Sequence, residues 1–522
     1  MSAIFTATLH PGVALGFLVL GASLHDILTR LKAEPQRFPK LDLVYSPTQP
    51  VTEPVILTLP ANGVRLRFDG PEQRLRLIEV IDFTKSRITY GQSEKELVKP
   101  ASASEQGASS PKLGAESSSG PNFRTIYHRL MGPTYAGEYI PPAEGDVNGV
   151  GTYVLSYPGV AFSFPLPEGM YSPDKDVVAL LSSSASQTAS SMAIFNGKSW
   201  AEARETLWTD VLPSIKSAFV FNKSKDVVPD EVSLVKIHGG GRLQFYKKWI
   251  NSSVWVILGV GGRARPPDAI YRKNDQRMYI HKARGASHSR SRSSASNYKR
   301  PDDLTDTDQS SAQMTGSDDS DDEAIEEEFA GNVSRECFFN YFYLGFDILV
   351  SPPVLPSRSP PSRASVANGD TLPGERSIKT DMPDRLVATK LVLHSNVPGS
   401  YPFNRHRRCR WEIQYLPSNS DAPANSETLF NDLEERLREE WKTTFPSESE
   451  ANQRQRGMVL NRGWGDSPGS SCEFLGGWED SSGGMAAKKF DGNEDSTTTL
   501  YGFPGLVFEV LKNGYVSAVT VF

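Results

Sequence analysis

Alternating apolar and polar residues return at four places in the chain, each time behind a glycine. The runs cover residues 63–68 with 75–80, 158–164 without a clear second run, 345–350 with 390–394, and 504–510 with 515–522. A period of two turns alternate side chains toward a core and toward water, which is typical of β-hairpins. We therefore predict four hairpins that repeat one β-rich module. The repeated phrase carries no reactive side chain and indicates surfaces rather than chemistry.

Helical spacing interrupts this pattern at two places. Residues 24, 27, 28 and 31 are all Leu or Ile and follow Ser23, which can cap a helix. They predict a helix from Leu24 to Lys32, which follows a buried strand from Leu15 to Leu20 along the chain. Large apolar residues four apart predict another helix over 429–442. The predicted fold class is α+β, with repeated modules of a short helix on a curved antiparallel β-sheet and long disordered insertions.

Shifts in composition divide the chain. Residues 282–300 hold six Lys or Arg and no acid, and residues 302–328 hold twelve Asp or Glu and no base. Such blocks bury too little apolar surface to fold and are predicted to be disordered. The predicted parts are a first α+β module (1–98), a disordered linker (99–122), a second β-rich module with the start of a third (123–281), a disordered charged insert (282–330), a third module (331–445) interrupted by a Pro/Ser-rich loop (352–384), a disordered Gly/Ser-rich loop (446–498) and a C-terminal hairpin (499–522).

Composition narrows the function. The net charge of −6 and the pI near 5.9 give no reason to expect nucleic-acid binding. The three cysteines lie far apart in sequence and cannot make a disulfide framework, which fits a reducing compartment such as the cytoplasm.

Two patterns together suggest an esterase, but the residues argue against one. The run His238-Gly239-Gly240-Gly241 resembles an oxyanion strand, and residues 465–469 match G-x-S-x-G. The residue after that serine is Pro468, which has no backbone N–H to offer an oxyanion. A glycine-rich run after Val256 lacks the third spaced glycine of a dinucleotide loop. We expect that the protein is not an enzyme and that it has no catalytic, cofactor-binding or metal-binding residues and no cofactor. A hydrolase remains the less favoured alternative.

Four arginines within six residues form the candidate site for an anion or a partner. Arg405, Arg407, Arg408 and Arg410 could bind a phosphate, a phosphoinositide headgroup or an acidic protein. The alternative is a solvated strand that pairs with acids elsewhere in the chain, including block 302–328. His406 and Cys409 lie three apart among these arginines, whose charge disfavours a metal. Candidate phosphorylation sites in the insert are Ser289, Ser291, Ser293, Ser317 and Ser320.

Taken together, the ordered segments resemble the phagosome (phagophore) assembly factor 1 family, formerly an uncharacterised protein family. The resemblance is carried by residues 21–28, 42–46, 63–69, 73–80, 132–137, 157–164, 268–271, 338–349 and 390–399. The two most distinctive pieces are Phe-Phe-Asn-Tyr-Phe-Tyr-Leu-Gly-Phe-Asp-Ile-Leu at 338–349 and Lys-Leu-Val-Leu-His-Ser-Asn-Val-Pro-Gly at 390–399. The predicted insertions lie outside the resemblance.

The resemblance implies a non-catalytic cytosolic adaptor or scaffold in autophagy. Its partner would be a β-propeller protein similar to the breast-carcinoma-amplified-sequence 3 protein, at the phagophore assembly site (preautophagosomal structure). Because that propeller reads phosphoinositide, the chain would associate with membranes indirectly. Alternatives are a Golgi or vesicle-trafficking factor and a module that binds phosphoinositide directly through the four arginines.

Overall fold

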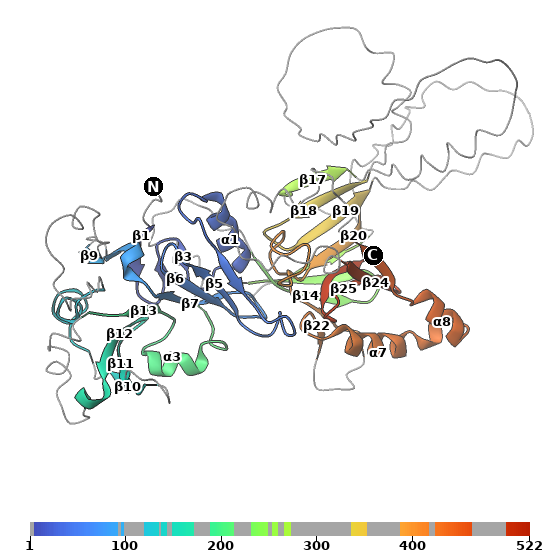
Figure 1. The fold of residues 1–522 in the computed structure, drawn as a ribbon. Helices are drawn as coiled ribbons and strands as arrows, with labels where there is room; N and C mark the ends of the chain where they lie inside the picture. The colour runs from blue at the N-terminus through green and yellow to red at the C-terminus, as the bar shows by residue number, and fades with distance from the viewer. Residues whose placement is uncertain are drawn as a thin grey trace, which may run out of the picture.

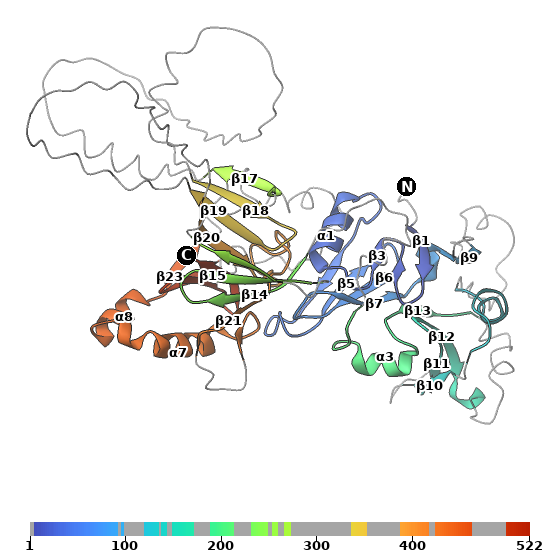
Figure 2. The same ribbon diagram turned by 180° about the vertical axis from the view of Figure 1, so that it is seen from behind.

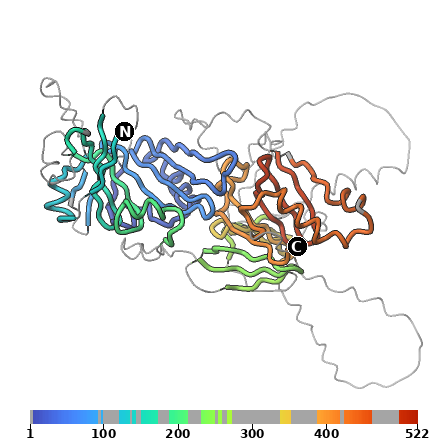
Figure 3. The backbone as a smooth tube through the Cα atoms, turned by 90° about the horizontal axis from the view of Figure 1, so that it is seen from below, coloured from blue at the N-terminus to red at the C-terminus, as the bar shows by residue number. Residues whose placement is uncertain are grey.

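The computed structural model describes thirteen segments of the chain: residues 5–91, 95–98, 120–134, 137–142, 149–171, 188–212, 231–248, 253–258, 266–272, 336–351, 387–416, 423–461 and 497–522. They form two lobes side by side, blue to green for residues 5–212 and light green to red for residues 231–522 (Figures 1 and 2). The end-on view keeps the two lobes apart and shows chain segments of both at the junction (Figure 3).

The first lobe contains a five-stranded and an eight-stranded sheet. Its elements are β1 (Phe5–His10), β2 (Ala14–Leu15), β3 (Leu18–Val19), α1 (Leu24–Ala33), β4 (Asp42–Val44), β5 (Val55–Leu59), β6 (Val64–Phe68), β7 (Leu75–Val80), η1 (Phe83–Lys85), β8 (Ser86–Tyr90), β9 (Lys95–Val98), the π-helix η3 (Thr125–Leu130), β10 (Glu138–Ile140), β11 (Val150–Tyr157), β12 (Val160–Pro167), η4 (Glu168–Met170), β13 (Ser191–Ile194) and α3 (Trp200–Thr206). The strand orders are β3-β2-β1-β8-β9 and β10-β11-β12-β13-β7-β6-β5-β4.

The second lobe repeats this arrangement. Its elements are β14 (Val232–His238), β15 (Arg242–Lys247), β16 (Ser253–Ile257), β17 (Ala269–Arg272), β18 (Cys337–Tyr341), β19 (Phe346–Ser351), β20 (Val387–His394), β21 (Trp411–Ile413), β22 (Ala424–Asn425), α7 (Phe430–Glu440), η5 (Lys442–Thr444), α8 (Glu448–Arg454), β23 (Met458–Asn461), β24 (Thr497–Phe503), β25 (Leu506–Val510) and β26 (Val516–Val521). The strand orders are β16-β15-β14-β21-β22 and β17-β18-β19-β20-β26-β25-β24-β23.

The eight-stranded sheet of each lobe is built from two four-stranded meanders. We call β4–β7, β10–β13, β17–β20 and β23–β26 the first to fourth meanders. The last strands of each pair of meanders join antiparallel, β7 to β13 and β20 to β26. The parallel pairs are β1 with β8 and β14 with β21. The described part of the chain is thus mostly antiparallel β-sheet with few helices, and the four repeated sequence phrases fall on the third and fourth strands of the meanders.

The glycine in front of each third strand is required by the turn. Gly63, Gly159, Gly345 and Gly505 have φ values of +66°, +78°, +83° and +77°, a region that other residues rarely enter. A Cβ at Gly345 would also lie 2.3 Å from the carbonyl oxygen of Arg407. The same backbone conformation therefore explains why the glycine recurs.

The helical part of the fold prediction is not confirmed for every module. A helix precedes the first, second and fourth meanders (α1, η3 and α7). The described residues between β16 and β17, which lead into the third meander, contain no helix. The strand predicted over 15–20 is instead two two-residue strands, because the chain turns at Gly16 with φ +59°. The predicted disordered loop 446–498 contains α8 and β23 at its start. Residues 282–330 and 352–384 lie outside the described residues.

Each lobe has its own apolar core between its two sheets. In the first lobe, the buried residues of β1 share one cluster with α1 and the inner face of the eight-stranded sheet. In the second lobe, β14, β15 and β21 share a cluster with α7 and the other sheet. A small apolar cluster of Val51, Val397 and Tyr515 lies where the two lobes meet.

Candidate functional site

The predicted anion site, here called the arginine segment (residues 405–410), lies at the junction of the lobes. Its backbone is fixed to the second lobe: the N–H of Arg407 donates to the carbonyl of Phe342 (2.8 Å), and that of Cys409 donates to His394 (2.9 Å). Its side chains contact the first lobe, Arg407 at Asp26 and Arg408 at Pro71. The segment is therefore placed to join the two halves of the molecule.

Arg407 reaches across this junction to carboxylates. Its guanidinium group contacts Asp26 of α1 and lies 3.2 Å from Glu231, and only 3% of its side chain is exposed. Glu231 has no exposed side chain and also pairs with Arg74 of the first lobe at 2.7 Å. Burial alone would raise the pKa of Asp26, but the Arg407 charge and the hydrogen bond from His25 hold it well below its ordinary value. Glu231 thus shares its charge between one arginine from each lobe.

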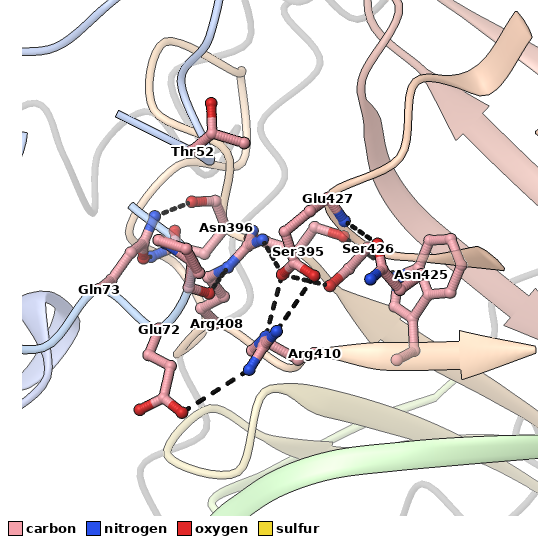
Figure 4. Close-up of polar contacts among 12 residues, drawn as sticks. Thr52, Glu72, Gln73, Ser395, Asn396, Arg408, Arg410, Asn425, Ser426 and Glu427 are labelled. Carbon is pink, nitrogen blue, oxygen red and sulfur yellow. Dashed lines mark hydrogen bonds and ion pairs between the residues drawn. The ribbon is translucent and has the colours of Figure 1, made fainter. Parts of the chain in front are cut away.

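Arg408 and Arg410 are held by Glu427 (Figure 4). Each lies 3.0 Å from a carboxylate oxygen of Glu427, and Arg408 also donates to the carbonyl of Pro71 in the first lobe (2.7 Å). Arg410 lies 3.7 Å from Glu72, which also pairs with Lys248. Burial works to raise the pKa of Glu427, but the charges of Arg408 and Arg410 outweigh it and the pKa is lowered. These carboxylates are therefore charged partners of the arginines.

A pair of amides completes the junction (Figure 4). The side chain of Gln73 donates to the carbonyl of Asn396, and the side chain of Asn396 donates to that of Gln73, each at 2.8 Å. The Asn396 side-chain oxygen also accepts the N–H of Asn404 at 2.7 Å. Both amide residues are nearly inaccessible to water. Buried polar groups satisfied in this way favour one relative orientation of the lobes.

The expected surface patch is wrong for Arg407 and Arg408, which are buried. Arg410 is partly covered, and Arg405 is exposed. The expectation failed because the pairing acids lie far away in sequence, at positions 26, 231 and 427. Acids elsewhere in the chain do pair with the cluster, as the alternative supposed, but the segment is buried instead of solvated. The direct phosphoinositide-binding alternative therefore loses two of its four proposed residues, Arg407 and Arg408.

A polar cluster next to the arginine segment has the composition of a metal site. Asp347, His394 and His406 each offer a ligand atom, all within 4.8 Å of one another. However, the two imidazole rings stack at 3.8 Å with 11° between their planes, and each Nε2 hydrogen-bonds the Asp347 carboxylate, at 2.8 and 2.9 Å. Parallel rings cannot both aim at one ion in their planes. The geometry therefore favours a hydrogen-bonded cluster over metal binding.

The charge state of this cluster follows from its burial. Burial and the neighbouring His394 lower the pKa of His406 to about 4, so the ring is neutral near pH 7. Burial would raise the pKa of Asp347, but hydrogen bonds from both histidines hold it well below its ordinary value. An ionised carboxylate between two Nε2–H donors is a stable arrangement.

The esterase and dinucleotide patterns do not form a reaction centre among the described residues. His238 is the last residue of β14, and Gly239 to Gly241 make the turn to β15, with Gly240 and Gly241 at positive φ. Residues 465–469 and the glycines after Leu258 lie outside the described residues. Burial raises the pKa of the Cys409 thiol to about 12, so this cysteine is not a ready nucleophile.

The candidate phosphorylation sites at 289, 291, 293, 317 and 320 also lie outside the described residues. Among the helices that are described, none has both the length and the apolar character needed to cross a membrane.

Comparisons with known proteins identify relatives of nearly full length. The model of a family described as phagosome assembly factor 1 matches residues 14–299 and 381–522. A PHAF1 protein of Arabidopsis thaliana is 22% identical over 520 residues, covering 98% of this chain and 92% of the relative. A PHAF1 protein of Drosophila melanogaster is 22% identical over 540 residues, covering 98% and 93%. No solved structure matches the chain.

Proposed function

Because the chain belongs to the phagosome assembly factor 1 family, we propose that it is a non-catalytic adaptor in autophagosome formation. The observation that carries this proposal is the family match, which spans both lobes. Its name describes assembly rather than a reaction. In this proposal the chain acts at the phagophore assembly site together with a β-propeller partner, which supplies the contact with phosphoinositide.

The junction supports the adaptor role over direct lipid binding. Two guanidinium groups that could have bound a headgroup are buried against Asp26, Glu231 and Glu427. Two lobes joined by buried ion pairs and amide hydrogen bonds suit protein–protein contacts, because preorganised surfaces lose less entropy on binding. In this proposal the arginine segment holds the lobes together, and partners bind elsewhere on the two lobes.

The test is affinity purification of the tagged full-length chain from starved and fed cells, followed by identification of the bound proteins. The proposal predicts a β-propeller protein that co-purifies, and fewer autophagosomes in cells that lack the chain. Vesicles containing phosphoinositide should bind the complex of the chain with its propeller partner. They should not bind the purified chain alone. Recovery of no propeller protein together with normal autophagosome numbers would contradict the proposal.

A further inference from the structure

One position of the repeated strand is buried in the first, second and fourth meanders and partly exposed in the third meander. Three residues after the repeated glycine lie Leu66, Phe162 and Phe508, each 0% exposed, whereas Ile348 at the same place is only partly buried. The residues paired with these four on the preceding strand are Leu57, Leu155, Tyr501 and Phe339, respectively. The register is therefore the same in all four meanders, and the positions can be compared directly.

Helices cover this face in the other meanders. The first residue of α1, Leu24, donates its N–H to Gln73, in the turn between the third and fourth strands. Phe430 of α7 donates equivalently to Gly514, and its ring lies 5.6 Å from that of Phe508. Phe123, just before η3, packs 5.6 Å from Phe164 of β12. A helical segment beside each of these meanders thus closes the core.

The connection in front of the third meander is too short for a helix of the length of α1 or α7, which have 10 and 11 residues. Residues 20–41 link β3 to β4 and include α1, which has 10 residues. Only residues 258–268 link β16 to β17, and of these just 259–265 lie outside the described residues. That stretch is shorter than α1 itself.

Apolar side chains are exposed on β16 and β17, the two strands that this short connection joins. Val254 on β16 and Ile270 on β17 lie on the inner face, paired with Phe245 and Phe339, and are 48% and 59% exposed. In the first lobe the equivalent strand β3 is buried throughout. β17 is the edge strand of its sheet (Figure 1). Ile270, Phe339 and Ile348 are paired side by side across β17, β18 and β19, and a contiguous, incompletely covered apolar row of this kind is typical of binding sites.

We propose that an amphipathic helix of a partner protein docks on the inner face of β16–β19, in the place that α1 and α7 take in their own meanders. The three internal helices have 10, 6 and 11 residues, which sets the expected length at two to three turns. Its apolar residues should fall at the i, i+3, i+4 and i+7 positions of helix-in-groove binding.

The chain's own charged insert is a poor occupant. The acidic block 302–328 contains only Leu304, Met314 and Ile325 as large apolar residues, spread over its whole length. By contrast, α1 buries four Leu or Ile side chains within ten residues. The docking proposal concerns where a partner binds, and it holds whether or not that partner acts in autophagosome formation.

The experiment places a photo-crosslinking amino acid, p-benzoylphenylalanine, at position 270 of the full-length chain in cells. The matched control is position 44 on β4, the first strand of the first meander, where Val44 is also 59% exposed. Mass spectrometry then identifies the crosslinked peptide. The proposal predicts a segment of another protein with amphipathic helical spacing, crosslinked from position 270 and not from position 44. Crosslinks to residues 273–335 or 352–386, to a second copy of the chain, or equally from both positions would overturn it.

A binding measurement with the identified segment completes the test. A labelled synthetic peptide of that segment should bind the purified full-length chain and gain helical circular dichroism. The double variant Val254→Asp with Ile270→Asp should weaken binding about tenfold or more, because two apolar contacts are lost. Val44→Asp should leave binding unchanged. Both altered positions are exposed, so equal melting temperatures would verify that folding is intact, and unchanged peptide affinity would contradict the proposal.

Discussion

The two lobes share one strand plan and differ in what covers it. Both have a five-stranded and an eight-stranded sheet, and in both the last strands of two meanders join at the centre. The first lobe covers both of its meanders with helical segments, whereas the described residues of the second lobe provide one only for its fourth meander. The shared plan explains folding, and the differences locate the surfaces available for partners.

The lobes also differ in what they bring to their junction. The second lobe contributes the arginine segment together with Glu231, and the first contributes Asp26, Glu72 and Arg74. The arginine segment, which looks like a ligand site when its sequence is considered alone, is therefore one side of the contact between the lobes. Four changes test this comparison, from the largest expected effect to the smallest.

Glu231→Gln should have the largest effect. It removes the charge between Arg74 and Arg407, whose side chains are 5% and 3% exposed. A broken buried ion pair costs about 3–5 kcal/mol, because charge is left buried without its partner. Chemical denaturation of the full chain measures the change. The matched control is Glu138→Gln, which breaks the exposed pair with Arg204 and should cost less than about 0.5 kcal/mol. Equal effects of the two changes would contradict the assignment.

Alanine substitution three residues after the repeated glycine should lower stability by different amounts in the first and third meanders. Leu66→Ala removes a fully buried side chain and should cost about 2–5 kcal/mol. Ile348→Ala, at the same place in the third meander, should cost about 1 kcal/mol because its site is partly open. Denaturation midpoints of both variants give the comparison. A loss at position 348 as large as that at position 66 would show that the third meander is covered after all.

Acid should weaken the second lobe through His406. Its pKa is lowered to about 4 from an ordinary value of 6.5, so the unfolded state binds more protons between these values. The stabilisation is complete above pH 6.5 and is lost as the pH falls toward 4, by about 1 kcal/mol at pH 5.5. Melting temperatures from pH 8 to 5 should fall more steeply for the natural chain than for His406→Gln. Parallel curves would rule out this titration.

Arg405→Gln should have the smallest effect. Arg405 is the exposed member of the arginine segment, and exposed substitutions usually change stability by less than about 0.5 kcal/mol. Arg407→Gln should be far more damaging because it leaves Asp26 without its buried arginine and Glu231 with Arg74 alone. Thermal melts of the two variants measure the contrast. Similar losses would mean that burial does not divide this segment as described.

Local elements could be predicted from the sequence, because their signals lie within a few residues. The helix predicted from Leu24 to Lys32 is α1 (Leu24–Ala33), and the one predicted over 429–442 contains α7 (Phe430–Glu440). The hairpins follow from alternation behind a glycine that needs positive φ. The fourth strand of the second meander, β13, was missed because it has only four residues and lies far beyond the phrase at 158–164.

Long-range contacts could not be predicted in the same way. Arg407 and Asp26 are 381 residues apart, and nothing in a single sequence says which acid will meet which arginine. The burial of Glu231 carries no local signal either, since it precedes β14 as an ordinary charged residue. The parallel pairing of β1 with β8 likewise depends on how the meanders close.

The central claim is that the arginine segment locks the two lobes into one unit. Differential scanning calorimetry of the full chain tests it most directly. The account predicts a single cooperative transition for the natural chain and two separated transitions for Glu231→Gln. Two transitions already present in the natural chain, at temperatures that this substitution leaves unchanged, would contradict it.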